Sequence, residues 1–135
     1  MEKLEHIGIA VKDLKGANAL FARLLGREHY KIENVESENV TTSFFEIGGV
    51  KIELLQATHE DSAISKFIDK KGEGVHHLAF EVKDIQDSIR HYQQLGFELV
   101  NPVAKKGADG KLICFLHPRS TGGVLVELCQ SVQEP

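Results

Sequence analysis

The chain has 135 residues, 41% of them hydrophobic, and a formal net charge of −4 with acidic and basic residues interspersed. This length predicts one compact domain, since each half, about 65 residues, would be marginal alone, and the missing cationic field disfavours a nucleic-acid partner. No apolar run approaches the roughly 20 residues that cross a membrane, and a strand pattern begins at once where a targeting segment would lie, so we expect a cytoplasmic protein with no membrane partner.

The first half of the chain predicts the element order β-α-β-β-β. Residues 5–11 alternate between bulky aliphatic and small side chains, which is the period of a strand. Asp13 can then cap a helix whose apolar residues recur at helical spacing until Gly26 ends it. The other strands are expected at about 27–32, 40–47 and 50–56, the last two joined by a two-residue turn at Gly48-Gly49.

A connecting helix leads into the second half, which repeats the same plan. The helix is expected at about 60–71, with Asp61 or Ser62 as its cap. Asp84 is expected to cap the helix of the second half, and Gly96 to end it. The strands of this half are expected at 76–82, about 97–100, 112–117 and 123–129.

Two segments of the first half recur in the second half in register. His6–Leu14 returns as His77–Ile85, a shift of 71 residues (77 − 6), and Gly49–Leu54 returns as Gly123–Leu128, a shift of 74 residues (123 − 49). Each half therefore has a histidine on its first strand and a glutamate on its last. A repeat in which polar strand positions recur indicates a shared site as well as a shared fold.

Strand alternation places four of these polar residues on one face of the predicted sheet. They are His6, Glu53, His77 and Glu127, while aliphatic residues occupy the opposite face, which the helices would cover. Two imidazoles and two carboxylates suit a divalent ion such as Co²⁺, Ni²⁺, Zn²⁺, Mn²⁺ or Fe²⁺. Any one of these residues alone would more often be an ordinary strand-end or solvated group, and their common register is what favours a metal site. The neighbouring His76 is expected to face the helices.

The predicted elements combine into an α+β fold. Two tandem βαβββ modules, about residues 1–58 and 74–130, are joined by the connecting helix at about 60–71. We expect the modules to form a curved mixed sheet around a metal pocket, within a single domain over residues 1–135.

The first hairpin adds a second candidate to the predicted pocket. A turn at Gly48-Gly49 fixes the register of the two strands, so that Thr42 and Glu46 lie on the same face as Glu53. Glu46 would face Lys51, either as a rim ion pair of little energetic weight or as a proton acceptor.

Three other features of the sequence carry predictions. Cys114 and Cys129, the two cysteines of the chain, are expected to be reduced thiols in the core or in the pocket wall. His117 is either a strand-end residue or a substrate contact. The loop at Lys105–Lys111 is either solvated or holds a polyanionic substrate such as a phosphate-bearing thioester.

Several segments resemble the methylmalonyl-CoA epimerases of the vicinal oxygen chelate superfamily. They are Gly74–Val82 and Phe115–Leu128, together with Lys51–Leu55 and Asp61–Phe67, and the resemblance covers nearly the whole chain. That superfamily is built from paired βαβββ modules around a divalent metal. The resemblance implies that the four residues of the repeat are metal ligands, with Co²⁺ as the first choice of ion and Ni²⁺, Zn²⁺ or Mn²⁺ as alternatives. It also implies an acyl-CoA substrate and a homodimer.

The reaction implied by the resemblance is the interconversion of (2R)- and (2S)-methylmalonyl-CoA. It proceeds by α-proton abstraction through a metal-stabilised enediolate, and inversion requires proton carriers on opposite faces. Glu127 is the first candidate for proton exchange and Glu46 the second. Some members carry a glutamate near the position of Thr42, whereas residues 40–45 contain no acid here, and Asn39 replaces a glycine. The alternatives are a glyoxalase similar to lactoylglutathione lyase and a metal-free small-molecule binding protein of the same fold.

Overall fold

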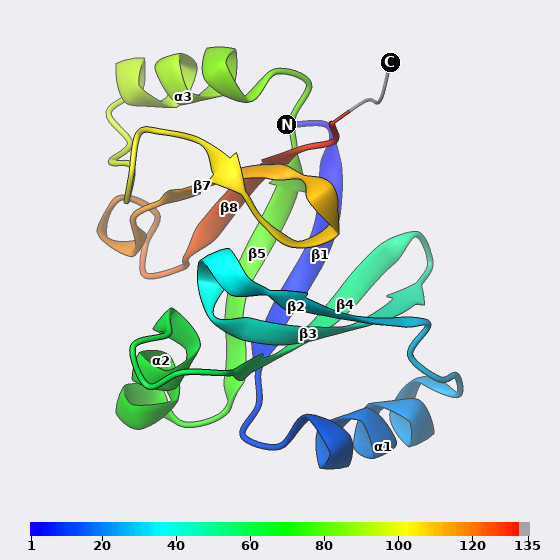
Figure 1. The fold of residues 1–135 in the computed structure, drawn as a ribbon. Helices are drawn as coiled ribbons and strands as arrows, with labels where there is room; N and C mark the ends of the chain where they lie inside the picture. The colour runs from blue at the N-terminus through cyan, green and yellow to red at the C-terminus, as the bar shows by residue number, and fades with distance from the viewer. Residues whose placement is uncertain (133–135) are drawn as a thin grey trace. The chain divides into compact units, whose positions relative to one another are not determined.

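The computed structural model of the protein describes residues 1–132 (Figure 1). The chain forms two compact units, which we call the N-terminal unit, His6–His76, and the C-terminal unit, residues 1–5 with the chain from His77 onward. Strands β1 (Lys3–Ala10) and β5 (Gly74–Glu81) each contribute residues to both units. None of the helices in residues 1–132 is long and apolar enough to cross a membrane.

The N-terminal unit contains the first βαβββ module and the connecting helix. Its strand order is β2-β3-β4-β1, in which β1 runs parallel to β4 and the other neighbours are antiparallel. Its further elements are α1 (Leu14–Leu25), β2 (Lys31–Val35), β3 (Val40–Ile47), β4 (Val50–Ala57) and α2 (Ala63–Lys71). Helix α1 packs on β3 and β4 through a core that includes Val11, Leu14, Phe45 and Leu54 (Figure 1).

The predictions for this unit are confirmed except at β2 and at the cap of α1, which is described below. The hairpin of β3 and β4 has the predicted strands and turn, and Ser62 caps α2 by accepting a hydrogen bond from the backbone N–H of Ile64 at 3.1 Å. The strand predicted at 27–32 instead begins at Lys31 and ends at Val35. The prediction was wrong because the residues between Gly26 and β2 bring the chain from the end of α1 to the sheet edge, where the Tyr30 N–H donates to the Phe44 carbonyl at 2.9 Å.

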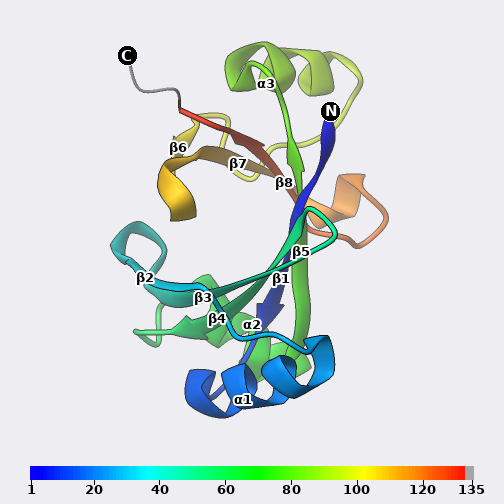
Figure 2. The ribbon, with the colours of Figure 1, turned by 90° about the vertical axis from the view of Figure 1, so that its right-hand side faces the viewer.

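The C-terminal unit contains the second module. Its strand order is β5-β8-β7-β6, with the first residues of β1 next to β5, where the Glu2 N–H donates to the Glu81 carbonyl at 2.7 Å. Its further elements are α3 (Ile85–Gln94), β6 (Lys105–Lys106), β7 (Leu112–Leu116) and β8 (Val126–Gln130). Helix α3 packs on β7 and β8 (Figure 2). The core between them includes Ile85 and Ile89 of α3 and Leu128 of β8.

Two predicted strands of this unit are shorter than expected. The strand expected at 97–100 is reduced to a single bridge between Leu99 and Leu116. The strand expected to begin at residue 123 begins at Val126, because Gly122 and Gly123 have positive φ values of 70° and 95° that do not continue a strand. The α+β fold of two βαβββ modules, each with a mixed sheet, is otherwise confirmed.

The first N–H group of each module's helix is capped from the module's last strand. The Leu14 N–H donates to Gln56 Oε1 at 2.6 Å, and the Ile85 N–H donates to Gln130 Oε1 at 2.7 Å. The two glutamines are separated by the repeat shift of 74 residues (130 − 56). Asp84 also caps α3 as predicted, by accepting from Asp87 N–H at 3.0 Å. Asp13 occupies the corresponding position before α1 but its side chain makes no cap hydrogen bond, so that part of the prediction was wrong.

We expect Gln56→Met or Gln130→Met to lower the free energy of unfolding by about 1 kcal/mol each, because methionine has a similar length but leaves the helix N–H without its acceptor. Urea unfolding measures this loss. Asp13→Ala is the control and should be nearly neutral. An equal loss in Asp13→Ala would contradict the assignment of the cap to glutamine.

Candidate metal centre

The N-terminal unit buries a histidine and a glutamate side by side. The parallel pairing of β1 with β4 sets Gly8 opposite Glu53, so that His6 and Glu53 point from the same face of the sheet. His6 Nδ1 lies 3.1 Å from Glu53 Oε2. The two residues are only 4% and 3% exposed, although both have strongly polar side chains. The small Gly8 beside them leaves room on this face.

The C-terminal unit repeats this pair. The parallel pairing of β5 with β8 sets Ala79 opposite Glu127, and His77 Nε2 lies 3.4 Å from Glu127 Oε1. Both residues are 5% exposed. The ring of Phe115 packs edge-on against the His77 imidazole, with the ring centroids 5.8 Å apart. In each half of the repeat, the predicted histidine ligand therefore lies beside the predicted glutamate ligand.

The chemistry of the two pairs fits a divalent metal ion. Burying a carboxylate is costly unless a positive charge or several hydrogen bonds compensate it. Imidazole nitrogen and carboxylate oxygen together are the donors that Co²⁺, Ni²⁺, Zn²⁺ and Mn²⁺ accept. These buried histidine and glutamate side chains are thus candidates to hold such an ion.

His76 has the packing role expected from its place next to His77. Its ring stands perpendicular to the ring of Phe67 on α2, with the centroids 5.0 Å apart. Burial lowers the pKa of His76 to about 4, so this imidazole is neutral at physiological pH. The prediction that His76 faces the helices is confirmed.

The two cysteines are buried thiols, as predicted. No disulfide joins Cys114 and Cys129. Burial, and then the nearby Glu127 carboxylate, raise the pKa of Cys114 to about 12. The same two causes, burial first, raise the pKa of Cys129, which packs with Ala79 and Ile113. Both thiols stay protonated at neutral pH and are therefore poor nucleophiles and poor metal ligands.

The predicted hairpin register is confirmed, and Thr42 and Glu46, which share a face, differ in burial. Glu46 faces Lys51 beside the turn and is exposed, and its backbone carbonyl accepts a hydrogen bond from Arg27 Nη1 at 2.9 Å. Thr42 is fully buried, and its Oγ1 has no hydrogen-bond partner among residues 1–132.

Sequence reasoning missed Glu33, which lies on the same face as Glu53. Glu33 pairs with Thr42 across β2 and β3, and Thr42 pairs with Leu55 across β3 and β4. Directly opposed residues of neighbouring strands share a face. The error in the limits of β2 placed Glu33 outside the predicted strand. The alternation of charged and apolar residues over Lys31, Ile32 and Glu33 is the signal that could have found it.

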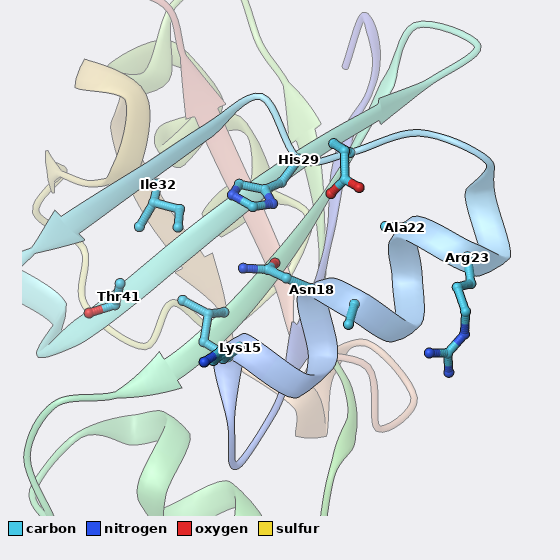
Figure 3. A pocket seen from close by; sticks show the side chains of 10 residues that line it. Lys15, Asn18, Ala22, Arg23, His29, Ile32 and Thr41 are labelled. Atoms are coloured by element: carbon cyan, nitrogen blue, oxygen red, sulfur yellow. The ribbon is translucent and has the colours of Figure 1, made fainter.

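A hollow of about 820 Å³ lies on the opposite face of the N-terminal sheet, between α1 and strands β2 and β3 (Figure 3). Asn18, His29 and Thr41 are among the residues that line it. Asn18 is nearly buried, and its Oδ1 accepts a hydrogen bond from Ser43 Oγ at 2.5 Å. Because Ser43 alternates with Thr42 along β3, this hollow is separate from the face that carries His6 and Glu53.

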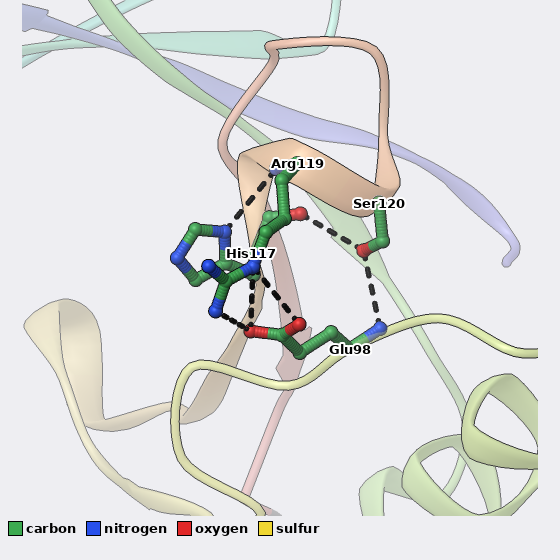
Figure 4. Close-up of polar contacts among 4 residues, drawn as sticks. All are labelled: Glu98, His117, Arg119 and Ser120. Atoms are coloured by element: carbon green, nitrogen blue, oxygen red, sulfur yellow. Dashed lines mark hydrogen bonds and ion pairs between the residues drawn. The ribbon is translucent and has the colours of Figure 1, made fainter.

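The loop after β7 is held by a network around Glu98 (Figure 4). Arg119 donates to the Glu98 carboxylate from Nε at 3.0 Å and from Nη2 at 2.5 Å, and the Glu98 N–H donates to Ser120 Oγ at 3.1 Å. The hydrogen bond from Arg119 lowers the pKa of Glu98 and raises that of Arg119. His117 Nδ1 accepts from the Arg119 N–H at 3.2 Å, so His117 serves as the cap of the short helix Pro118–Ser120.

The segment Lys105–Lys111 is partly engaged within the unit. Lys105 and Lys106 form β6, and Lys111 Nζ donates to Ser131 Oγ at 2.8 Å. A Cβ at Gly107 would lie 2.6 Å from Ile113 Cδ1, so a larger residue there would force the Ile113 side chain to move. The segment is therefore a folded part of the sheet edge and not a fully solvated loop.

The chain is built from two βαβββ modules. Each module has a buried histidine–glutamate pair on the sheet face that its helix leaves uncovered. These features define a class of paired-module proteins with a candidate metal site. The chain belongs to the Glyoxalase/Bleomycin resistance protein/Dioxygenase superfamily, whose family model matches residues 5–115.

Its relatives include epimerases. The uncharacterized protein YqjC of Bacillus subtilis (strain 168) is 39% identical over 130 residues, which are 96% of this chain and 93% of the relative. The ethylmalonyl-CoA/methylmalonyl-CoA epimerase of Cereibacter sphaeroides is 37% identical, with 95% of this chain and 97% of the relative covered. A Streptomyces coelicolor methylmalonyl-CoA epimerase variant in complex with 2-nitronate-propionyl-CoA has a TM-score of 0.92 at 34% identity, covering 100% of this chain and 99% of that one.

We expect elemental analysis to find about one divalent ion per chain, and His77→Ala or Glu127→Ala to remove it, because each variant loses a ligand. His76→Gln is the matched control and should keep the ion, since His76 packs on Phe67. Full metal content in both alanine variants would contradict the ligand assignment. Loss of the ion in His76→Gln, with retention in His77→Gln, would show that the ligand is the other histidine.

Proposed function

We propose that this protein is a metal-dependent epimerase that interconverts (2R)- and (2S)-methylmalonyl-CoA. The observation that carries the proposal is the buried histidine–glutamate pair of each unit, at 3.1 Å and 3.4 Å, in a chain related over nearly its whole length to methylmalonyl-CoA epimerases. The solved relative bound to 2-nitronate-propionyl-CoA supports an acyl-CoA as the substrate.

In this proposal His6, Glu53, His77 and Glu127 together hold one divalent ion, with Co²⁺ as the first choice and Ni²⁺, Zn²⁺ or Mn²⁺ as alternatives. Two neutral imidazoles and two carboxylates carry a charge of about −2, which such an ion balances. When bound, the ion would supply Lewis-acid stabilisation of negative charge on the substrate, worth several kcal/mol.

The protein's own residues would then move the proton at C2. The C2–H bond breaks, its electron pair stays on the substrate, and a carboxylate takes the proton. Glu127 is the first candidate because it is buried against Phe115 and His77 and would lie next to the substrate if it holds the ion. Phe115, Ala79 and Cys129 make the same face apolar and would help to exclude bulk water.

Inversion at C2 requires a second proton carrier. Glu46 is one candidate, although its exposed position beside the hairpin turn suits a rim ion pair with Lys51 better. Glu53 and an ordered water are further candidates within the same proposal.

The activity is tested by deuterium uptake at C2 of methylmalonyl-CoA in heavy water. We expect uptake into both epimers with added Co²⁺, and loss of uptake after treatment with a chelator. The hemithioacetal of methylglyoxal and glutathione should give no lactoylglutathione in the same preparation. Formation of lactoylglutathione without deuterium uptake into methylmalonyl-CoA would support a glyoxalase instead, and activity unaffected by chelators would contradict the metal.

We expect Glu127→Gln to lower epimerisation by about two to four orders of magnitude, because an amide cannot accept the proton. Metal content is measured alongside, since the amide oxygen can keep part of the ion. A variant that retains both metal and wild-type turnover would exclude Glu127 as a proton carrier.

A further inference from the structure

We propose that Glu33 on β2 is the second proton carrier of the reaction and that the Thr42 hydroxyl positions the transferred proton beside it. This inference rests on the proposed function and names a catalytic residue within it. It is carried by the register of the N-terminal sheet and by the buried hydroxyl of Thr42.

The register puts Glu33 on the metal-binding face. Glu33 pairs with Thr42, and in the next row Lys31 pairs with Phe44, which pairs with Glu53. Lys31 Nζ lies 4.8 Å from the centroid of the Phe44 ring, as expected for side chains on one face. The charged residues of β2 therefore point to the side where Glu53 and His6 are buried.

The spacing on this face suits a small acyl group. Glu33 is two strands and two residues away from Glu53, which corresponds to about 12 Å between their Cα atoms. Thr42 lies between them, one strand away from each. If Glu53 holds the ion, this separation leaves room for the reacting carbons of a short-chain acyl thioester between Glu33 and the ion.

The second observation is the buried hydroxyl of Thr42, a polar group at a position from which water is excluded. The residue is 0% exposed, and Oγ1 has no hydrogen-bond partner among residues 1–132. An unsatisfied buried hydroxyl destabilises the folded state, so such a group calls for a specific role. A hydroxyl both donates and accepts, and it can therefore hold a substrate oxygen or a water next to Glu33.

Glu33 has the access to solvent that a proton carrier needs. Its side chain is 30% exposed, and its carboxylate lies 3.5 Å from Lys31 Nζ. After each turnover the carboxylate can exchange its proton with water. Glu46, by comparison, lies beside the turn, two rows away from Thr42, and faces Lys51.

The proton balance of the proposed step is simple. In one direction the C2–H bond breaks, its electron pair remains on the substrate and Glu33 takes the proton, while Glu127 delivers a proton to form the new C2–H bond on the other side. In the reverse direction the roles are exchanged. Both carboxyl groups return to their starting states by exchange with water, so no other reactant is required.

Glu33→Gln provides the test, with each epimer incubated separately in heavy water. We expect epimerisation to fall at least about a hundredfold, while one epimer still takes up deuterium at C2 without inversion, because Glu127 remains a functional base. Metal content should be that of the wild type. Glu36→Gln, an equal change of charge at an exposed residue of the same unit, is the control and should leave both reactions unchanged.

Thr42→Val tests the hydroxyl with little change of shape. We expect epimerisation to fall about tenfold, the worth of one hydrogen bond, with unchanged metal content and a thermal unfolding midpoint at or above that of the wild type. Thr42→Ser should restore turnover.

Wild-type epimerisation in Glu33→Gln would overturn the assignment. Loss of metal, or loss of exchange in both epimers, would also overturn it, because either result indicates a structural role. If the wild-type protein itself exchanges neither epimer, the proposed function fails and the role of Glu33 fails with it.

Discussion

The parallel pairing of the first and last strands of each module is the constraint on which the rest of the structure depends. Strand β1 lies beside β4 and β5 lies beside β8, in the same register relative to the repeat. Parallel neighbours cannot be joined by a tight turn, so the chain must cross over through a helix and two further strands. This pairing sets a small residue, Gly8 or Ala79, opposite the glutamate and thereby brings the histidine and glutamate together.

The two faces of each sheet differ in composition: one carries the apolar core and the other carries the candidate metal ligands. One face packs under α1 or α3 through aliphatic and aromatic side chains, and this burial stabilises the fold. The other face buries imidazoles and carboxylates, which disfavour folding unless their charge is balanced. Glutamine side chains at the ends of β4 and β8 cap α1 and α3, so the strands that carry the glutamates also hold the helices in place.

The two modules differ most at their edges. In the N-terminal unit β2 is a five-residue strand with Lys31 and Glu33 on the face of Glu53. In the C-terminal unit the corresponding edge strand, β6, has two residues and sets Lys105 opposite Ile113, at the place that Glu33 takes opposite Thr42. The carboxylate of Glu98 in this unit is engaged with Arg119. The repeat thus supplies equivalent candidate ligands from both halves, but an edge-strand carboxylate on the same face from only one. An asymmetric pair of proton carriers is consistent with this difference.

By itself, the sequence determined the modules, the hairpin register and the common face of His6, Glu53, His77 and Glu127, because strand alternation and turn residues act over a few positions. Only the tertiary structure decided where β2 begins, and hence that Glu33 faces Thr42. The register of an edge strand is set by hydrogen bonds to a distant segment, and the sequence near residue 30 has no turn that fixes it. The glutamine caps were undetectable for the same reason, since each acceptor lies more than 40 residues from its helix.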